Sequence, residues 1–250
     1  MHVGRLEAER PVEYPDSDGQ PMADNTLQFQ WIVTIKENLD VRFPDFVAGD
    51  LLWYPVEGDN KQRQAPDVLV ALGRSKGYRG SYRQWEEGGV APAVVFEVLS
   101  PGNRFGELQR KFRFYERFGV EEYYVFDPDR LSLDVYLRRG GRLEEVENPG
   151  SFVSPRLGIR FELGDDLEIF DRDGARFATF AEIIEAKHKA ERAQLEAERA
   201  RDDAQRERDD AQRERDDAQR ERDDAQRERD DARNRADELL AKLRAAGLEP

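Results

Sequence analysis

Residues 93–99 constrain the fold of this chain more than any other segment. They read Ala-Val-Val-Phe-Glu-Val-Leu, so Glu97 is the only polar residue in the run. A short apolar run that ends in turn residues, here Ser-Pro-Gly-Asn at 100–103, is typical of a central strand covered on both faces. The sheet to which this strand belongs therefore needs a covering layer on each side.

Two helices are expected to supply those layers. One is expected over residues 105–118, stopping at Gly119, because glycine suits the position that follows a helix. The other is expected over residues 25–39, where Asn25 or Thr26 can cap it and apolar residues recur every four positions.

Further strands surround this unit. They are expected at residues 50–54, 65–72, 123–126 and 131–137, with shorter ones near 143–146 and 167–170. A strand–helix–strand unit followed by mixed strands predicts an α/β fold with a mixed sheet.

The C-terminal part is an internal repeat of seven residues. Arg-Asp-Asp-Ala-Gln-Arg-Glu begins at Arg201 and recurs three more times, which places Ala204 and its equivalents on one heptad position. The other seam position holds Glu207 and its equivalents in the middle of the repeat. Opposite charges four residues apart favour a solvated single helix. A weak alanine coiled coil that forms a homodimer is the alternative, and a nucleic-acid-binding tail is disfavoured because acids outnumber bases.

Composition separates three regions. Thirty-eight per cent of residues are charged, and from Ala181 onward nearly every residue is charged, Gln or Ala. We therefore expect an irregular N-terminal segment over residues 1–24, an α/β domain over 25–178, and a charged heptad-repeat helix over 179–250.

Charge and residue usage exclude several classes of protein. The net charge of −14 argues against a protein that coats nucleic acid, although Arg74, Lys76, Arg79 and Arg83 form one local basic stretch. The chain has no cysteine and only two histidines, which disfavours disulfides, thiolate chemistry and histidine-based sites. No apolar run approaches the length of a membrane span, so a cytoplasmic protein with no membrane association is expected.

Glu97 and Lys111 are the first candidates for chemistry. A carboxylate inside an apolar strand is costly to desolvate, so Glu97 needs a metal or a partner such as arginine. When residues 105–118 are wound as a helix, Lys111 is the only charged residue within the apolar face. It either reaches the sheet near Glu97 or extends its amine to solvent. Asp67 begins a strand, and alone it reads as a turn carboxylate.

Two carboxylates and an inward lysine suit metal-dependent phosphodiester cleavage. Oxygen ligands favour Mg²⁺ or Mn²⁺, which activates water and polarises a phosphate. The lysine would orient that water or neutralise charge that develops in the transition state.

Four segments, taken in order, resemble the Uma family of restriction-endonuclease-like proteins. They are PDVLVALG (66–73), APAVVFEVLSPGNR (91–104), KFRFY (111–115) and FGVEEYYVFDPD (118–129).

This resemblance implies the PD-(D/E)XK nuclease fold, a Mg²⁺ site and DNA as substrate. It matches Asp67 and Glu97 to the two acidic metal ligands. Leu99 stands where the ordinary motif has lysine, and Lys111 matches a lysine that has moved to the following helix. Glu107 is similar to an accessory acid of the family, and Glu37 is a candidate for an extra acid on the first helix. A catalytically silent module that binds nucleic acid or protein, or a plain scaffold protein, remains the alternative to an endonuclease.

Overall fold

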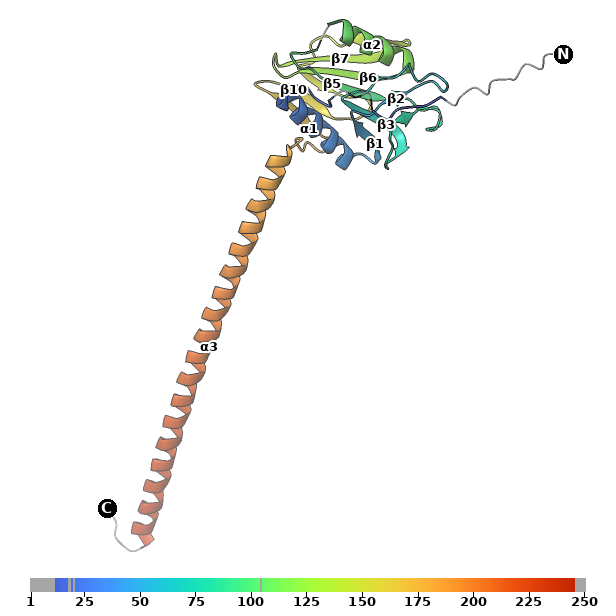
Figure 1. The fold of residues 1–250 in the computed structure, drawn as a ribbon. Coiled ribbons are helices and arrows are strands. Elements are labelled where there is room, and N and C mark those ends of the chain that lie inside the picture. The colour runs from blue at the N-terminus through green and yellow to red at the C-terminus, as the bar shows by residue number, and fades with distance from the viewer. Residues whose placement is uncertain (1–11, 18, 20, 104, 246–250) are drawn as a thin grey trace, which may run out of the picture. The chain divides into compact units, whose positions relative to one another are not determined.

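A mixed six-stranded sheet forms the centre of the fold (Figure 1). The computed structural model describes residues 12–17, 19, 21–103 and 105–245. Strand β5 is parallel to β6, and the other neighbours in the order β1-β3-β5-β6-β7-β8 are antiparallel. The strands are β1 (Asp45–Gly49), β3 (Val68–Ser75), β5 (Val94–Val98), β6 (Glu122–Asp127), β7 (Ser132–Arg139) and β8 (Arg142–Glu145).

Two smaller sheets complete the domain. One has the order β11-β10-β9, and the other is a short parallel pair of β2 and β4. Their strands are β2 (Trp53–Tyr54), β4 (Tyr82–Arg83), β9 (Ser151–Val153), β10 (Arg160–Leu163) and β11 (Leu167–Phe170).

The helices α1 (Thr26–Arg42) and α2 (Phe105–Phe118) cover opposite faces of the six-stranded sheet (Figure 1). Buried residues of α1, β10 and β11 form one core with one face of the sheet. Tyr115 of α2 packs with Trp53 and Val95 in a second core on the other face. The predicted mixed sheet flanked by helices is confirmed.

The helix ends follow the capping rules. The side chain of Asn25 accepts a hydrogen bond from the backbone of Gln28 at 2.8 Å, which satisfies a free N–H in the first turn of α1. That helix ends before Pro44, three residues later than expected. Gly119 follows α2 with φ at 97°, a conformation that glycine adopts without strain.

The expected strand at residues 50–54 is wrong in its first half. Strand β1 ends at Gly49, and Asp50 then adopts a left-handed backbone with φ at 48°, which turns the chain out of the sheet. Of the apolar residues that recur every four positions in α1, Ile35 and Leu39 are buried, but Leu27 is 38% exposed.

The N-terminal segment and the C-terminal helix flank this domain in sequence. Residues 1–11, 18 and 20 of the expected irregular segment lie outside the described residues, as does His2, and its described residues form neither helix nor strand. Helix α3 (Phe180–Ala245) begins with a reciprocal cap between Thr179 and Glu182. The chain divides between Ile183 and Ile184 into two compact units.

A buried carboxylate ties the six-stranded sheet to the loop before β10. Glu122, at the start of β6, accepts hydrogen bonds from the hydroxyls of Ser154 and Tyr124 and from the backbone N–H of Arg156. Burial raises the pKa of Glu122 above its ordinary value of 4.5, although these hydrogen bonds oppose the shift.

We expect Glu122→Gln to change how stability depends on pH. A raised pKa in the folded state means that the stabilising contribution is complete below about pH 4.5 and is lost as pH rises through the folded pKa. The stability of the Gln variant relative to the natural protein should therefore increase between about pH 4 and pH 7. Urea denaturation at several pH values measures this difference, and a difference that does not change with pH would contradict the prediction.

Candidate active site

Asp67 directly precedes β3, and Glu97 lies in the neighbouring strand β5. The register pairs Val68 of β3 with Phe96 of β5, and continuing it by one residue brings Asp67 beside Glu97. Side chains alternate along a strand, and both carboxylates point to the face that α2 covers. The backbone N–H of Val98 donates to Asp67 Oδ2 at 2.6 Å. Like charges directly opposite each other are destabilising, so this pair needs compensating positive charge.

Helix α2 supplies that charge to Glu97. Lys111 Nζ lies 2.7 Å from Glu97 Oε2, and the hydroxyl of Tyr115 donates to Glu97 Oε1 at 2.5 Å. The two residues are four positions apart, so they share one face of the helix. Glu97 is 2% exposed and Lys111 is 8% exposed. The structure thus brings Asp67, Glu97 and Lys111 together.

Electrostatic effects follow from this burial. Desolvation, and after it the charge of Glu97, raises the pKa of Asp67 well above its usual range, although Lys111 and the Val98 N–H oppose the shift. Burial by itself would lower the pKa of Lys111, but Glu97 and Asp67 outweigh it and raise this pKa. Burial and Glu97 also raise the pKa of Tyr115, so its hydroxyl keeps the proton that it donates.

Only one of the two accessory candidates lies at the site. Glu107 lines the same small cavity as Asp67 and Lys111, which has a volume of about 290 Å³. Glu37 is exposed on α1, where it forms an ion pair with Lys36 at 3.0 Å, and it does not line that cavity. The structure therefore does not bring Glu37 to the site.

Several residues of the site were not recognised from sequence. Tyr115 has the helical spacing of a core aromatic residue. Its second role, the hydrogen bond from its hydroxyl to Glu97, becomes visible only in the structure. Gln28 donates from its side-chain amide to the Val98 carbonyl at 2.7 Å and also lines the cavity. Asp24 and Asp50 contribute two more carboxylates to the lining. The position of Gln28 on the buried face of α1 is the one signal that sequence could have given.

The N-terminal segment forms one wall of the cavity. Pro21, Met22 and Ala23 line it, and the carboxylate of Asp24 accepts a hydrogen bond from Ser100 Oγ at 2.6 Å. Further toward the N-terminus, the ring of Tyr14 lies 5.2 Å from that of Tyr54 and 5.0 Å from that of Trp85. The segment thus contacts the domain at two places, and one of them is the cavity wall.

The donor atoms at this cavity fit a hard cation. Carboxylates of Asp24, Asp50, Asp67 and Glu107 and side-chain amides provide oxygen, without thiolate or imidazole. In the described part of the chain, no group of three or more His, Cys, Asp or Glu is arranged to hold a metal ion. Mg²⁺ is commonly bound through one or two carboxylates with water and phosphate in the remaining positions, so two carboxylates are sufficient for it.

The basic stretch is neutralised by nearby acids. Arg79 forms an ion pair with Glu87 at 2.5 Å, and Lys76 pairs with Asp40 at 3.1 Å. Arg83 lies 3.3 Å from Glu86. These contacts remove much of the positive potential that the sequence indicated for residues 74–83.

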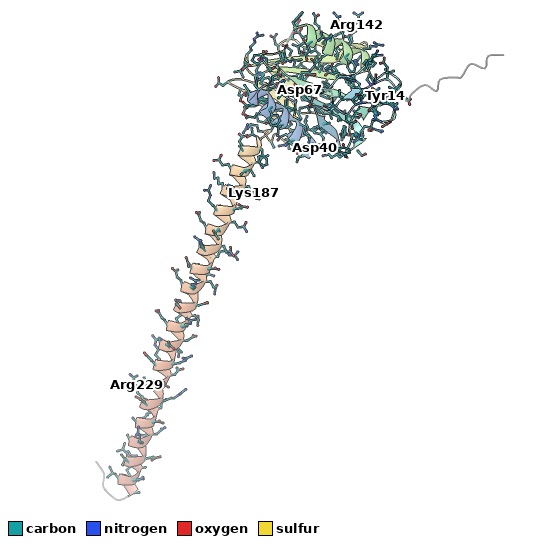
Figure 2. The ribbon with its side chains drawn as sticks, in the orientation of Figure 1. Tyr14, Asp40, Asp67, Arg142, Lys187 and Arg229 are labelled. Carbon is teal, nitrogen blue, oxygen red and sulfur yellow. The ribbon has the colours of Figure 1, made fainter. Side chains whose placement is uncertain are left out.

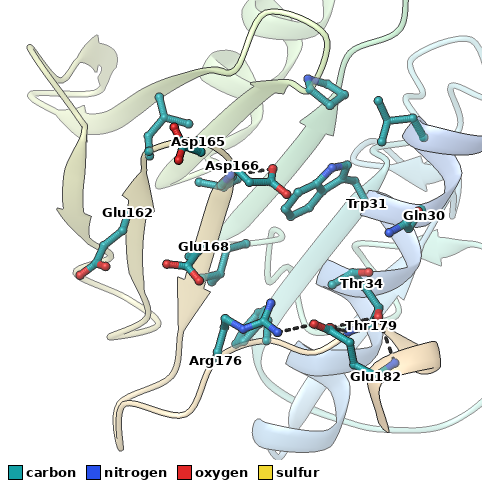
Figure 3. Close-up of a pocket in the computed structure, with 17 residues that line it drawn as sticks. Gln30, Trp31, Thr34, Glu162, Asp165, Asp166, Glu168, Arg176, Thr179 and Glu182 are labelled. Carbon is teal, nitrogen blue, oxygen red and sulfur yellow. Dashed lines mark hydrogen bonds and ion pairs between the residues drawn. The ribbon is translucent and has the colours of Figure 1, made fainter. Parts of the chain in front are cut away.

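Another hollow of the domain, about 860 Å³, has a different lining from the candidate site (Figure 3). Trp31 of α1 and the acidic residues Asp165, Asp166 and Glu168 surround it, and Arg176 pairs there with Glu182. Asp67, Glu97 and Lys111 do not line it.

None of the helices in residues 12–17, 19, 21–103 and 105–245 combines the length and apolar character that crossing a membrane requires.

Comparisons with known proteins identify what the chain resembles. It matches the model of the Uma2 family, described as “Putative restriction endonuclease”, over residues 8–168. No curated protein matches it. A similar solved structure is described as a putative nuclease belonging to DUF820 from Anabaena variabilis. The sequences are 17% identical, the alignment covers 53% of this chain and 72% of the other, and the TM-score is 0.38.

We expect Lys111→Met to lower the free energy of unfolding by about 3–5 kcal/mol, because it leaves the Glu97 carboxylate buried without its cation. The double variant Glu97→Gln with Lys111→Met should lose much less, since both charges of the buried pair are removed together and only the Asp67 carboxylate remains. Chemical denaturation of both variants measures the coupling. Lys187→Met, on the exposed face of α3, is the control and should change stability by less than about 0.5 kcal/mol. Additive losses in the double variant would show that the pair is not coupled.

We expect Tyr115→Phe to cost about 1.5–3 kcal/mol, because a hydrogen bond to a buried carboxylate is lost while the ring remains. Denaturation midpoints and slopes measure the change. The control adds Phe114→Tyr to Tyr115→Phe, which moves the hydroxyl to the neighbouring helical position. This double variant should not recover stability, because a hydroxyl at position 114 cannot replace the one lost at position 115. Recovery there would mean that the loss does not come from the contact with Glu97.

Proposed function

The chain belongs to the Uma2 family of restriction-endonuclease-like proteins, and on this premise we propose that it is a metal-dependent endonuclease that hydrolyses DNA phosphodiester bonds. The observation that carries the proposal is the meeting of Asp67, Glu97 and Lys111: Asp67 and Lys111 line one cavity, and Glu97 is buried in contact with Lys111. Two carboxylates can hold a divalent cation, and a lysine can stabilise charge that develops on a phosphate.

The carboxylates are proposed to hold the metal. Asp67 and Glu97 would bind Mg²⁺ or Mn²⁺, which would polarise the scissile phosphate and activate a water molecule when bound. The Val98 N–H holds one oxygen of Asp67, and Tyr115 holds one oxygen of Glu97. These contacts would hold both carboxylates in place before a cation binds. Cation binding would then cost less side-chain conformational entropy.

Lys111 is proposed to stabilise charge on the reacting phosphate. Its raised pKa keeps the amine protonated at neutral pH, and its ion pair with Glu97 holds it beside the cavity. A fixed positive charge in a buried site stabilises negative charge that develops in a transition state. Lys111 would also be able to orient the attacking water from this position.

A DNA strand is the proposed substrate. The cavity volume of about 290 Å³ leaves room for a phosphate group and its sugar. A net charge of −14 gives no long-range attraction for DNA, so local contacts and the metal must supply the affinity.

The absence of cysteine from the sequence agrees with a cytoplasmic protein.

One observation favours the alternative, a catalytically silent module that binds nucleic acid or protein. Both carboxylate oxygens of Glu97 already have partners in Lys111 and Tyr115. In a silent module this arrangement would be a structural ion pair, whereas in the enzyme Glu97 would share an oxygen between Lys111 and the metal.

The test is plasmid cleavage with Mg²⁺ or Mn²⁺. We expect the natural protein to nick the plasmid and chelation of the metal to abolish nicking. Asp67→Asn, Glu97→Gln and Lys111→Met should each reduce the rate by at least about 100-fold. Circular dichroism is needed beside each assay, because the Lys111 variant is also expected to be less stable.

Glu37→Gln is the matched control, because Glu37 is a carboxylate outside the cavity, and it should cleave like the natural protein. Equal cleavage by the Asp67, Glu97 and Lys111 variants would disprove the assigned roles. A folded natural protein that neither cleaves DNA nor binds Mn²⁺ in calorimetry would support the silent module.

A further inference from the structure

Helix α3 carries a column of small apolar residues between two columns of opposite charge. If heptad position a is set at Ala190, every seventh residue as far as Leu239 is alanine or leucine. The acidic column at position g contains Glu196, Asp203, Asp210, Asp217 and Asp224, and the basic column at position e contains Arg201, Arg208, Arg215, Arg222 and Arg229. Arg229 is labelled in Figure 2.

The arginines at position e have no partner on their own helix. From Arg208 to Arg222, the residues three and four positions away on either side are alanine or glutamine, so no carboxylate is within reach. Within residues 180–245, which the structure describes, the five arginines at e make no ion pair or hydrogen bond. The arginines at position c differ, because Arg213 lies 3.2 Å from Asp210 and its equivalents repeat this contact.

We propose that α3 pairs with α3 of a second copy of this chain in a parallel, in-register coiled coil. In such a pair, each g residue faces the e residue five positions later on the other helix. Asp203 would then face Arg208 of the second copy, and the same pairing recurs along the repeat. An antiparallel pair would instead place g against g and e against e, so acids would face acids and arginines would face arginines. The charge columns therefore fit the parallel orientation.

The spacing of the alanine column supports a partner. An α-helix has 3.6 residues per turn, so a strict seven-residue repeat drifts by about 20° in each heptad. From Ala190 to Leu239 the column would wind by roughly 140° around a straight helix. Supercoiling around a second helix keeps the whole column in one interface. The side chains of α3 are exposed along its length, so the column is available for this contact.

The residues at position d determine which interactions can stabilise the dimer. Position d holds Glu207, Glu214, Glu221 and Glu228, so its central part buries little apolar surface. Association must depend on the ion pairs between e and g, and it should weaken as salt screens them. Dimerisation through α3 is independent of the nuclease chemistry, so either proposal can fail without the other.

Single cysteines test the geometry directly, because the chain contains no cysteine. Full-length Ala190→Cys and Ala232→Cys should each form a disulfide-linked homodimer under mild oxidation, since a residues meet their own equivalents in a parallel pair. Asp216→Cys, on the outer face, is the control and should cross-link far less. Crosslinks between Ala190→Cys and Ala232→Cys chains, with no homodimers, would show an antiparallel pair and overturn the proposal.

Charge exchange tests the ion pairs. A g variant (D203R, D210R, D217R and D224R) and an e variant (R208D, R215D, R222D and R229D) should each weaken self-association by roughly 100-fold in sedimentation. An equimolar mixture of the two should restore the dimer as a heterodimer. A monomeric mass for the natural full-length protein at micromolar concentration, or a mixture that stays monomeric, would overturn the proposal.

Discussion

The buried ion pair between Lys111 and Glu97 is the interaction on which the centre of this domain depends. The carboxylates of Asp67, just before β3, and Glu97, in β5, lie close together, and their mutual repulsion and desolvation would disfavour this arrangement without a nearby cation. Lys111 supplies the charge, and Tyr115 completes the hydrogen bonds of Glu97. The position of α2 over the sheet is therefore set by polar contacts as well as by its apolar face.

Under the proposed function, those same contacts would let one cluster serve both folding and chemistry. A pair that is fully compensated is stable but inert, whereas Asp67 keeps a raised pKa and lies at a cavity rich in oxygen donors. Under the proposed function, a divalent cation would compensate the carboxylate charge that Lys111 leaves. Stability and metal affinity would then oppose each other at this cluster.

Local patterns predicted much of this arrangement. The apolar run at 93–99 predicted β5, and the single charge on the apolar face of α2 placed Lys111 toward the sheet. Asp67 was recognised through family resemblance, since a carboxylate at the start of a strand is common. Asp24 could not be recognised, because it reaches the cavity only through packing between distant segments, and the only signal for Gln28 was its position on the buried face of α1. The prediction that Asp50 belongs to a strand is wrong, because its left-handed backbone conformation depends on tertiary context.

The four-residue spacing between Lys111 and Tyr115 has a consequence for how the chain can vary in length. Each residue of a helix turns the following side chains by about 100°. An insertion or deletion within α2 ahead of Lys111 would rotate both side chains away from Glu97 together, unless the helix moved at its start. After a length change in the turn that follows β5, α2 could still rotate about its own axis and keep Lys111 and Tyr115 facing Glu97. Variation in chain length should therefore be tolerated before α2 and excluded within its first two turns.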